Sequence, residues 1–186
     1  MPPPPQPPAG PPAPTAPNQP NSGPTSPQPE TGTVMLSDVM GRDRSVNVFA
    51  GFTRDFAAIS NRFDDITQNS TVLAPLNSAI EALPRKPWED PEDYRTQGAD
   101  AYEGPGGQER AQENLRRFVE AHIVPVSPWP EHYKANALVG DGEMWWETTA
   151  DGKRVLQPGN IEVSSVASTV ANGQVWIIKG VRNYST

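Results

Sequence analysis

Thr71-Val72-Leu73-Ala74-Pro75-Leu76-Asn77-Ser78-Ala79-Ile80 is the stretch of the chain that decides the fold. Its first four residues combine β-branched and apolar side chains, and they predict a short buried strand that Pro75 stops. Asn77 is a suitable N-cap for a short helix over residues 78–83, and Pro84 ends that helix. We therefore expect a strand that leads directly into a helix.

The residues before this stretch predict a helical region between Leu36 and Phe63. Apolar side chains recur there at steps of three and four residues, which is the spacing of a helix that packs one face on a core: Val46, Phe49, Phe52, Phe56 and Ile59. We expect this region to break near Gly51, because glycine is a poor helix former.

The residues after the stretch change from polar to helical. Residues 85–108 are acidic and rich in proline and glycine, and they predict a long surface loop. Residues 109–122 follow, with Leu115, Phe118, Val119 and His122 at helical spacing, and Pro125 ends this helix.

The last third of the chain has the period of strands rather than helices. Asp151-Gly152 and Asn172-Gly173 each separate two short apolar runs, and both dipeptides favour tight hairpin turns. A helical first half and a hairpin-rich second half predict an α+β fold.

Composition divides the chain into two parts. The first 30 residues hold 14 of the 23 prolines, no aromatic residue and one charge, Glu30. Such a segment has too little apolar surface to offset its chain entropy, so we expect residues 1–32 to be a disordered proline-rich arm. Residues 33–186 fall in the usual size range of one folded domain. Because Met1 stands directly before Pro2, we expect that a leader has been removed from this end.

Charge and cysteine content exclude several classes of function. The formal net charge of −7 argues against a nucleic-acid partner, which would require clustered Lys and Arg. The chain has no cysteine, so it has neither disulfides nor thiolate nucleophiles. No apolar run approaches the length of a membrane span, so we expect no span.

Three stretches resemble the signatures of the fasciclin domain family, FAS1, in their order and spacing. The stretch 71–80 resembles the first signature, residues 115–125 resemble the central helix with its following His-Ile-Val-Pro, and residues 171–181 resemble the closing hairpin. With the apolar segment 36–39, the resemblance covers essentially all of 33–186, and it is closest to the single-domain fasciclin-like proteins of fungi.

The resemblance implies a wedge of β-sheet, built as two packed sheets, with several helices around it. It also implies a non-catalytic module, secreted or lumenal, that acts in cell adhesion or in contact with a cell wall or matrix through protein–protein interaction. The implied location is extracellular or in the cell wall, with a vacuolar lumen as the alternative. Expected partners are a protein or glycan of the cell surface or wall, and the module is also expected to associate weakly with itself.

The sequence departs from the family pattern at two positions. Ala121 stands where the family often has an aromatic residue before the histidine, and Trp176 stands where it often has a histidine. The aromatic-histidine region has been tied to integrin binding in some animal members, so Ala121 argues against integrin recognition here.

The segment His122-Ile123-Val124, part of the second FAS1-like stretch, is the first candidate interaction site. His122 could titrate near neutral pH at a surface, or it could be a structural histidine at a helix end whose ring bonds to backbone.

The second candidate site is formed by tryptophans. Trp145 and Trp146 are neighbours on a predicted strand, so only one of them can enter a one-sided core. The other, joined by Trp129 or Trp88, could stack on sugar rings, which gives the alternative function of a polysaccharide-binding module. It could instead be covered by the acidic segment 85–108.

The sequence also bears on covalent modification and on catalysis. Asn69 and Asn183 begin N-x-Ser/Thr sequons and are candidate N-glycosylation sites. No catalytic motif, cofactor motif or metal-ligand spacing occurs, so we expect no enzyme activity, no cofactor and no metal site. A hydrolase remains the third hypothesis, because carboxylates are plentiful.

Overall fold

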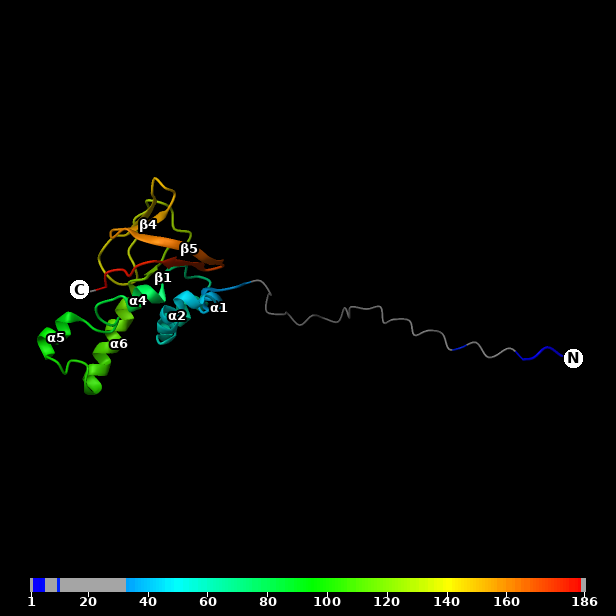
Figure 1. Cartoon of the computed structure of the whole chain (residues 1–186), viewed down its shortest axis with the longest axis horizontal. Helices are drawn as coiled ribbons and strands as arrows, with labels where there is room; N and C mark the ends of the chain where they lie inside the picture. The colour runs from blue at the N-terminus through cyan, green and yellow to red at the C-terminus, as the bar shows by residue number, and fades with distance from the viewer. Residues whose placement is uncertain (1, 6–9, 11–32, 185–186) are drawn as a thin grey trace. The chain divides into compact units, whose positions relative to one another are not determined.

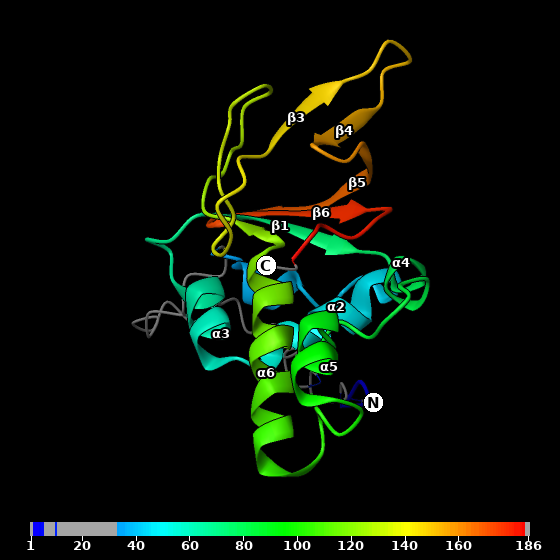
Figure 2. The same cartoon turned by 90° about the vertical axis from the view of Figure 1, so that its left-hand side faces the viewer.

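The computed structural model describes residues 2–5, 10 and 33–184. By its internal contacts the chain divides into Met1–Gly32 and Thr33–Thr186. Most of the proline-rich arm, residues 1–32, lies outside the described residues, so its disorder stays a prediction. The folded unit is drawn in Figures 1 and 2.

Helices dominate the first half of the folded unit, and strands dominate the second. In chain order the elements are α1 (Leu36–Val39), η1 (Arg44–Val46), α2 (Asn47–Arg54), α3 (Ala57–Asp64), β1 (Ser70–Pro75), α4 (Asn77–Glu81), α5 (Pro91–Gln97), α6 (Gly104–Glu120), β2 (Ile123–Val124), β3 (Trp145–Thr148), β4 (Arg154–Gln157), β5 (Ile161–Val170) and β6 (Gly173–Ile178). This order confirms the α+β class and both predicted hairpins, β3–β4 and β5–β6.

The strands form one mixed sheet in the order β2-β1-β6-β5-β4-β3. Strands β1 and β6 are parallel neighbours in the middle, and every other pair is antiparallel. Both central strands are buried on their two faces, which explains why β1 reads as a continuous apolar run without alternation.

The two faces of the central strands support two separate cores. Val72 and Val175 face the helices and join the core that α1, α2, α3 and α6 cover. Leu73 and Trp176 face the opposite way and meet residues of β3 and β4. Figure 2 shows this division, with the helices on one side of β1 and β6 and the β3–β4 hairpin on the other.

The expected pair of packed sheets is one connected sheet that curls. Strand β5 pairs with β6 along its length but carries register shifts at Val163/Ser165 and Val166/Ser168. Such bulges increase local twist and bend a strand. The bend brings β4 and β3 over the Trp176 face. The second core therefore lies between two parts of one curled sheet, where we expected it to lie between two separate sheets.

Two helix boundaries differ from the sequence prediction. Helix α2 continues through Gly51 to Arg54, and the break comes at Asp55 and Phe56. Helix α4 has Leu76 as its N-cap, while Asn77 serves a different purpose. The Asn77 side chain accepts a hydrogen bond from Val48 N at 3.1 Å, so it ties α4 to the start of α2.

The predicted surface loop over residues 85–108 is wrong in part, because it contains helix α5 and the first turn of α6. Asn114 of α6 explains why this segment is ordered: its amide donates to Trp88 O at 3.0 Å and to the Asp93 carboxylate at 2.8 Å. The Tyr102 hydroxyl donates to the same carboxylate at 2.8 Å. Burial raises the pKa of Tyr102 to about 12, so this hydroxyl keeps its proton at all ordinary pH values.

Asn172 connects three distant parts of the folded unit. Its side-chain oxygen accepts from Leu36 N at 2.9 Å, and its amide donates to Phe63 O at 2.8 Å. The residue is fully buried in the β5–β6 turn. The next residue must be glycine, because a Cβ at Gly173 would collide with the Ser70 carbonyl oxygen.

We expect Asn172→Ala to lower the free energy of unfolding by about 2–4 kcal/mol, because it leaves a buried backbone donor and a buried acceptor without partners. Urea denaturation followed by circular dichroism measures the change. The control is Asn61→Ala on the exposed face of α3, which should change stability by less than about 0.5 kcal/mol. Equal losses in the two variants would contradict the role given to Asn172.

Candidate functional site

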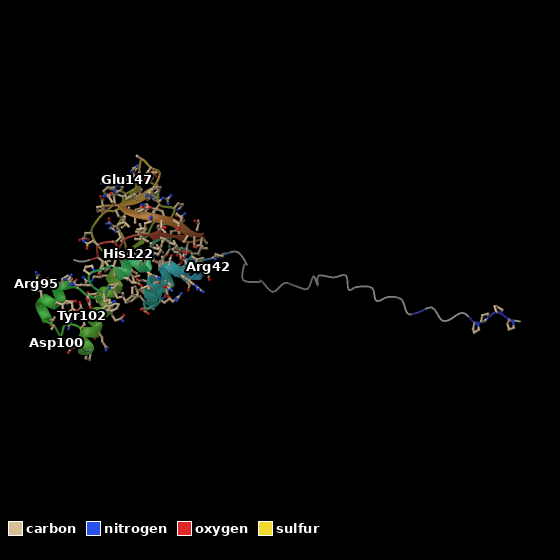
Figure 3. The ribbon with its side chains drawn as sticks, in the orientation of Figure 1. Arg42, Arg95, Asp100, Tyr102, His122 and Glu147 are labelled. Atoms are coloured by element: carbon tan, nitrogen blue, oxygen red, sulfur yellow. The ribbon has the colours of Figure 1, made fainter. Side chains whose placement is uncertain are left out.

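His122 is a buried structural residue at the end of α6. The ring nitrogen Nδ1 lies 2.6 Å from Phe118 O, and Nε2 accepts a hydrogen bond from Arg182 N at 2.9 Å. Because Arg182 N can only donate, Nε2 must be unprotonated and Nδ1 carries the single proton. Figure 3 shows His122 in the interior, between the helices and the sheet. The arrangement agrees with the structural alternative.

The neighbours of His122 are equally inaccessible. Ile123 and Val124 form β2 and are fully buried against β1. A partner therefore cannot touch these three side chains directly in the folded domain. Their effect on the surface is indirect, because His122 fixes the backbone of Arg182.

The protonation of His122 opposes folding. Burial, reinforced by the Arg182 charge, lowers the pKa of His122 from 6.5 to about 4, although the bond to Phe118 acts in the other direction. Between these two pKa values the unfolded chain binds more protons than the folded chain. The contribution of His122 to stability is therefore fully present above pH 6.5 and is lost as the pH falls toward 4.

We expect the free energy of unfolding to fall by about 2 kcal/mol between pH 7 and pH 5 through His122 alone. Urea midpoints at intervals of half a pH unit measure this slope. His122→Gln should be less stable at pH 7 and should show a flatter slope. An unchanged slope in His122→Gln would refute the assignment.

Three tryptophans contact one another within the second core. Trp129 stacks on Trp176 with ring centroids 5.5 Å apart, and Trp146 meets Trp176 edge to face at 5.8 Å. The Trp146 Nε1 donates to Trp129 O at 2.9 Å. Trp129 and Trp146 are thus buried, and neither is available to a sugar ring.

Arg154 of β4 covers this cluster, and sequence reasoning missed it. Its guanidinium carbon lies 4.1 Å from the Trp146 ring centroid and 4.6 Å from that of Trp176. The π faces of the two indoles attract the cation, and burial holds the pKa of Arg154 below its usual value. The Trp146-x₇-Arg154 spacing across a predicted hairpin was the one signal that could have suggested the contact.

Trp145 faces the other way and is half-buried, as strand alternation requires. The Lys134 ammonium lies 5.5 Å from its ring centroid. Tyr133 precedes Lys134 and is 53% exposed. Tyr133, Lys134 and Trp145 together are called the edge patch below, because β3 is an edge strand of the sheet.

The acidic segment does not cover the edge patch. Figure 3 places Arg95, Asp100 and Tyr102 together at the helical end of the folded unit, away from Glu147 of β3. The Lys134 ammonium near the Trp145 ring is paired with the Glu143 carboxylate, 3.5 Å away. Trp145 therefore keeps part of its surface exposed to solvent.

The two neighbouring tryptophans should behave differently on substitution. We expect Trp146→Ala to lower the free energy of unfolding by about 3–5 kcal/mol, because it empties a buried cluster. Trp145→Ala should cost less than about 1 kcal/mol. Guanidinium denaturation measures both, and similar losses for the two variants would contradict the assignment of faces.

The other predicted sites are placed as follows. Asn69 and Asn183 are both exposed, and Ser185 of the second sequon lies outside the described residues. Within residues 33–184 no group of three or more His, Asp or Glu side chains could hold a metal ion. In the same part of the chain, no helix is long and apolar enough to cross a bilayer.

Comparison with known proteins gives fungal relatives. A FAS1 domain-containing protein of Neurospora crassa is 64% identical over 153 residues, which are 82% of this chain and 67% of that protein. FAS1 domain-containing proteins of Aspergillus fumigatus and Emericella nidulans are 51% and 50% identical, over 81% and 80% of this chain and 64% and 61% of theirs. The chain thus spans about two thirds of the length of these curated relatives.

Two further comparisons add little. No family model matches the chain. A solved FAS1 domain pair from the insect cell adhesion molecule fasciclin I gives a TM-score of 0.45 at 18% identity, over 75% of this chain and 45% of that chain, which is too low to carry an argument. Because the chain is 64% identical to the Neurospora protein over 82% of its length, it belongs to the FAS1 domain family.

Proposed function

We propose that this chain is a non-catalytic FAS1 module that acts in cell adhesion or in contact with a cell wall or matrix through protein–protein interaction. The observation that supports it most directly is the edge patch, where Tyr133 is 53% exposed and the half-buried Trp145 ring lies 5.5 Å from the Lys134 ammonium. Tyrosine and tryptophan are the residues most enriched at the energetic centres of protein interfaces.

The edge patch offers side chains rather than an open strand edge. The backbone of β3 is partly satisfied from outside the sheet, since Trp146 O accepts from His132 N at 2.9 Å. On the same edge, Thr148 N donates to the Glu131 carboxylate at 2.7 Å. A partner that adds a strand would have to displace both bonds, so recognition through the aromatic side chains is favoured.

The non-catalytic part of the proposal is supported by the state of His122. Both of its ring nitrogens are bonded to backbone groups, and the ring is fully buried, so it cannot exchange a proton with a substrate. His132, the other histidine, is exposed on a loop beside Glu131. Neither histidine is arranged as a general base for a nucleophile.

The module is further proposed to work outside the cell or in the cell wall, with a vacuolar lumen as the alternative. The exposure of Asn69 and Asn183 supports this proposal, because an enzyme of the secretory pathway could modify either side chain. Production of the whole protein in a fungal host, followed by enzymatic deglycosylation, should lower its mass. Absence of any mass change would remove this support.

We expect Trp145→Ala to weaken binding to a protein ligand at least about tenfold while it leaves the fold intact. The measurement is an array of purified matrix proteins and wall polysaccharides probed with residues 33–186, followed by titration of each hit. The matched control is Ile66→Ala, which removes a 55% exposed side chain outside the edge patch.

Each outcome of the array has a definite meaning. Protein binding that Trp145→Ala abolishes supports the adhesion proposal, as does concentration-dependent self-association with the same dependence. Binding to a neutral polysaccharide with the same dependence would replace it by the glycan-binding alternative. Binding that Trp145→Ala and Ile66→Ala leave equally unchanged would overturn the role of the edge patch.

A further inference from the structure

A pocket of about 430 Å³ lies beside the end of α6, next to the residue pair His122 and Arg182. The loop over residues 139–142, the turn at Pro158-Gly159 and the segment after β6 form its walls. Its size is within the range of small-ligand sites. The pocket shares no lining residue with the edge patch, so it raises a separate question of function.

Arg182 is the cationic group of this pocket, and its charge is poorly compensated. The guanidinium makes one long hydrogen bond, from Nη1 to Pro158 O at 3.4 Å. Its Nε is buried and has no hydrogen-bond partner within the part of the chain that the structure describes. Among the described residues, no carboxylate lies within 4.0 Å of this side chain. A partly buried cation in this state is costly unless an anion joins it.

The position of Arg182 is fixed independently of its side chain. Its backbone N–H is bonded to His122 Nε2, and His122 is in turn bonded to Phe118 O. The core thus holds the Cα of Arg182 at the pocket while the guanidinium keeps donors unused. Burial also holds the pKa of Arg182 below its usual value, yet an arginine remains charged at neutral pH.

A second arginine lines the space next to this pocket. Arg117 borders an adjoining pocket of about 480 Å³, and both pockets are lined by Ala121, Val139, Gly140, Asp141 and Asn183. The Arg117 Nε is likewise buried without a hydrogen-bond partner. Its charge is partly compensated, since the Asp90 carboxylate lies 3.8 Å away. Arg182 is therefore the stronger anion site of the two.

Asp141 restricts which anion suits the pocket. This exposed carboxylate lines both pockets and would repel a dianion such as phosphate. It would accept hydrogen bonds from hydroxyl groups of a ligand with a single negative charge. Apolar walls from Ala137, Val139 and Ile161 suit the C–H face of a sugar ring.

We propose that this pocket binds a sugar carboxylate of the uronic-acid class, with the carboxylate on the Arg182 guanidinium and the ring hydroxyls on Asp141. A planar guanidinium matches a carboxylate through two parallel N–H···O bonds, and the terminal Nη1 and Nη2 groups, of which Nη1 makes only a long bond to Pro158 O, would supply them. This inference goes beyond the proposed adhesive function and does not rest on it, because it concerns other residues and a ligand of another class.

The test is a titration of the whole chain with glucuronate, glucose and inorganic phosphate. Bacterial production keeps Asn183, at the rim of the pocket, free of glycan. Calorimetry and NMR of the arginine Nε–H signals are the two readouts. We expect glucuronate to bind, to shift the Arg182 Nε–H signal, and to bind more tightly than either glucose or phosphate.

Three variants examine the roles of the charges. Arg182→Met should weaken glucuronate binding at least about tenfold, because it removes the charged fork but keeps the backbone bond to His122. Asp141→Asn should weaken glucuronate less and should strengthen phosphate. Arg95→Met, on the exposed surface of α5, is the matched control and should bind as wild type.

Several results would overturn the proposal. Equal binding of glucose and glucuronate would remove the role of the carboxylate, and tighter binding of phosphate would make the pocket a simple anion site. Absence of glucuronate binding would refute it outright. If Arg182→Met failed to fold, the wild-type Nε–H signal would still decide, since a bound carboxylate must shift it and a signal unmoved at saturation contradicts the assignment.

Discussion

The parallel pairing of β1 with β6 is the constraint on which the rest of the structure depends. It aligns Val72 with Val175 and Leu73 with Trp176, so two segments that are far apart in the sequence form one two-stranded ribbon at the centre of the sheet. Both faces of the ribbon are apolar, and a two-sided apolar ribbon is stable only if both faces are covered. The helices cover one face, and the curl of β5 brings β3 and β4 over the other. Closing so distant a contact costs chain entropy, and Asn172 at the start of the β6 turn helps to fix it through bonds to Leu36 and Phe63.

The two cores that grow from this ribbon separate structural chemistry from surface chemistry. On the helical side, His122 at the end of α6 holds the segment after β6 in place, because its ring accepts a hydrogen bond from Arg182 N. On the strand side, the stacked indoles fix β3 so that Trp145 must face outward. A buried residue therefore fixes the position of each surface residue. His122 fixes Arg182 through a hydrogen bond, and Trp146 fixes Trp145 as its neighbour in the chain. The surface can vary in charge and shape while the buried neighbour keeps its position.

Sequence reasoning recovered the elements that depend on local rules. Strand β1, the two hairpins and the α+β class follow from residue periods and from Gly at the turns. It failed where tertiary contacts override local composition. Residues 85–108 read as a loop because proline and glycine are frequent, yet Asn114 holds α5 against α6 through bonds that no local pattern encodes. Asn77 was predicted to be a helix cap from its local position, but its side-chain oxygen instead accepts a hydrogen bond from Val48 N of helix α2. The buried state of Trp129 was also missed, since only the curl of the sheet brings it onto Trp176.

The contrast between Arg154 and Arg182 shows why candidate sites are harder to predict than folds. Both are arginines in the last third of the chain, both are partly buried, and burial lowers the pKa of both. Arg154 lies over two indole rings, and their π faces compensate its charge within the domain. Among residues 33–184, Arg182 has no such aromatic neighbour, and its Nε has no hydrogen-bond partner there. The chemical type of the residue is the same in both cases, so the difference arises entirely from what the fold places around it. A cation that the fold already compensates is part of the structure, whereas a cation that it leaves uncompensated gains free energy from a ligand, and only the second kind can act as a binding site.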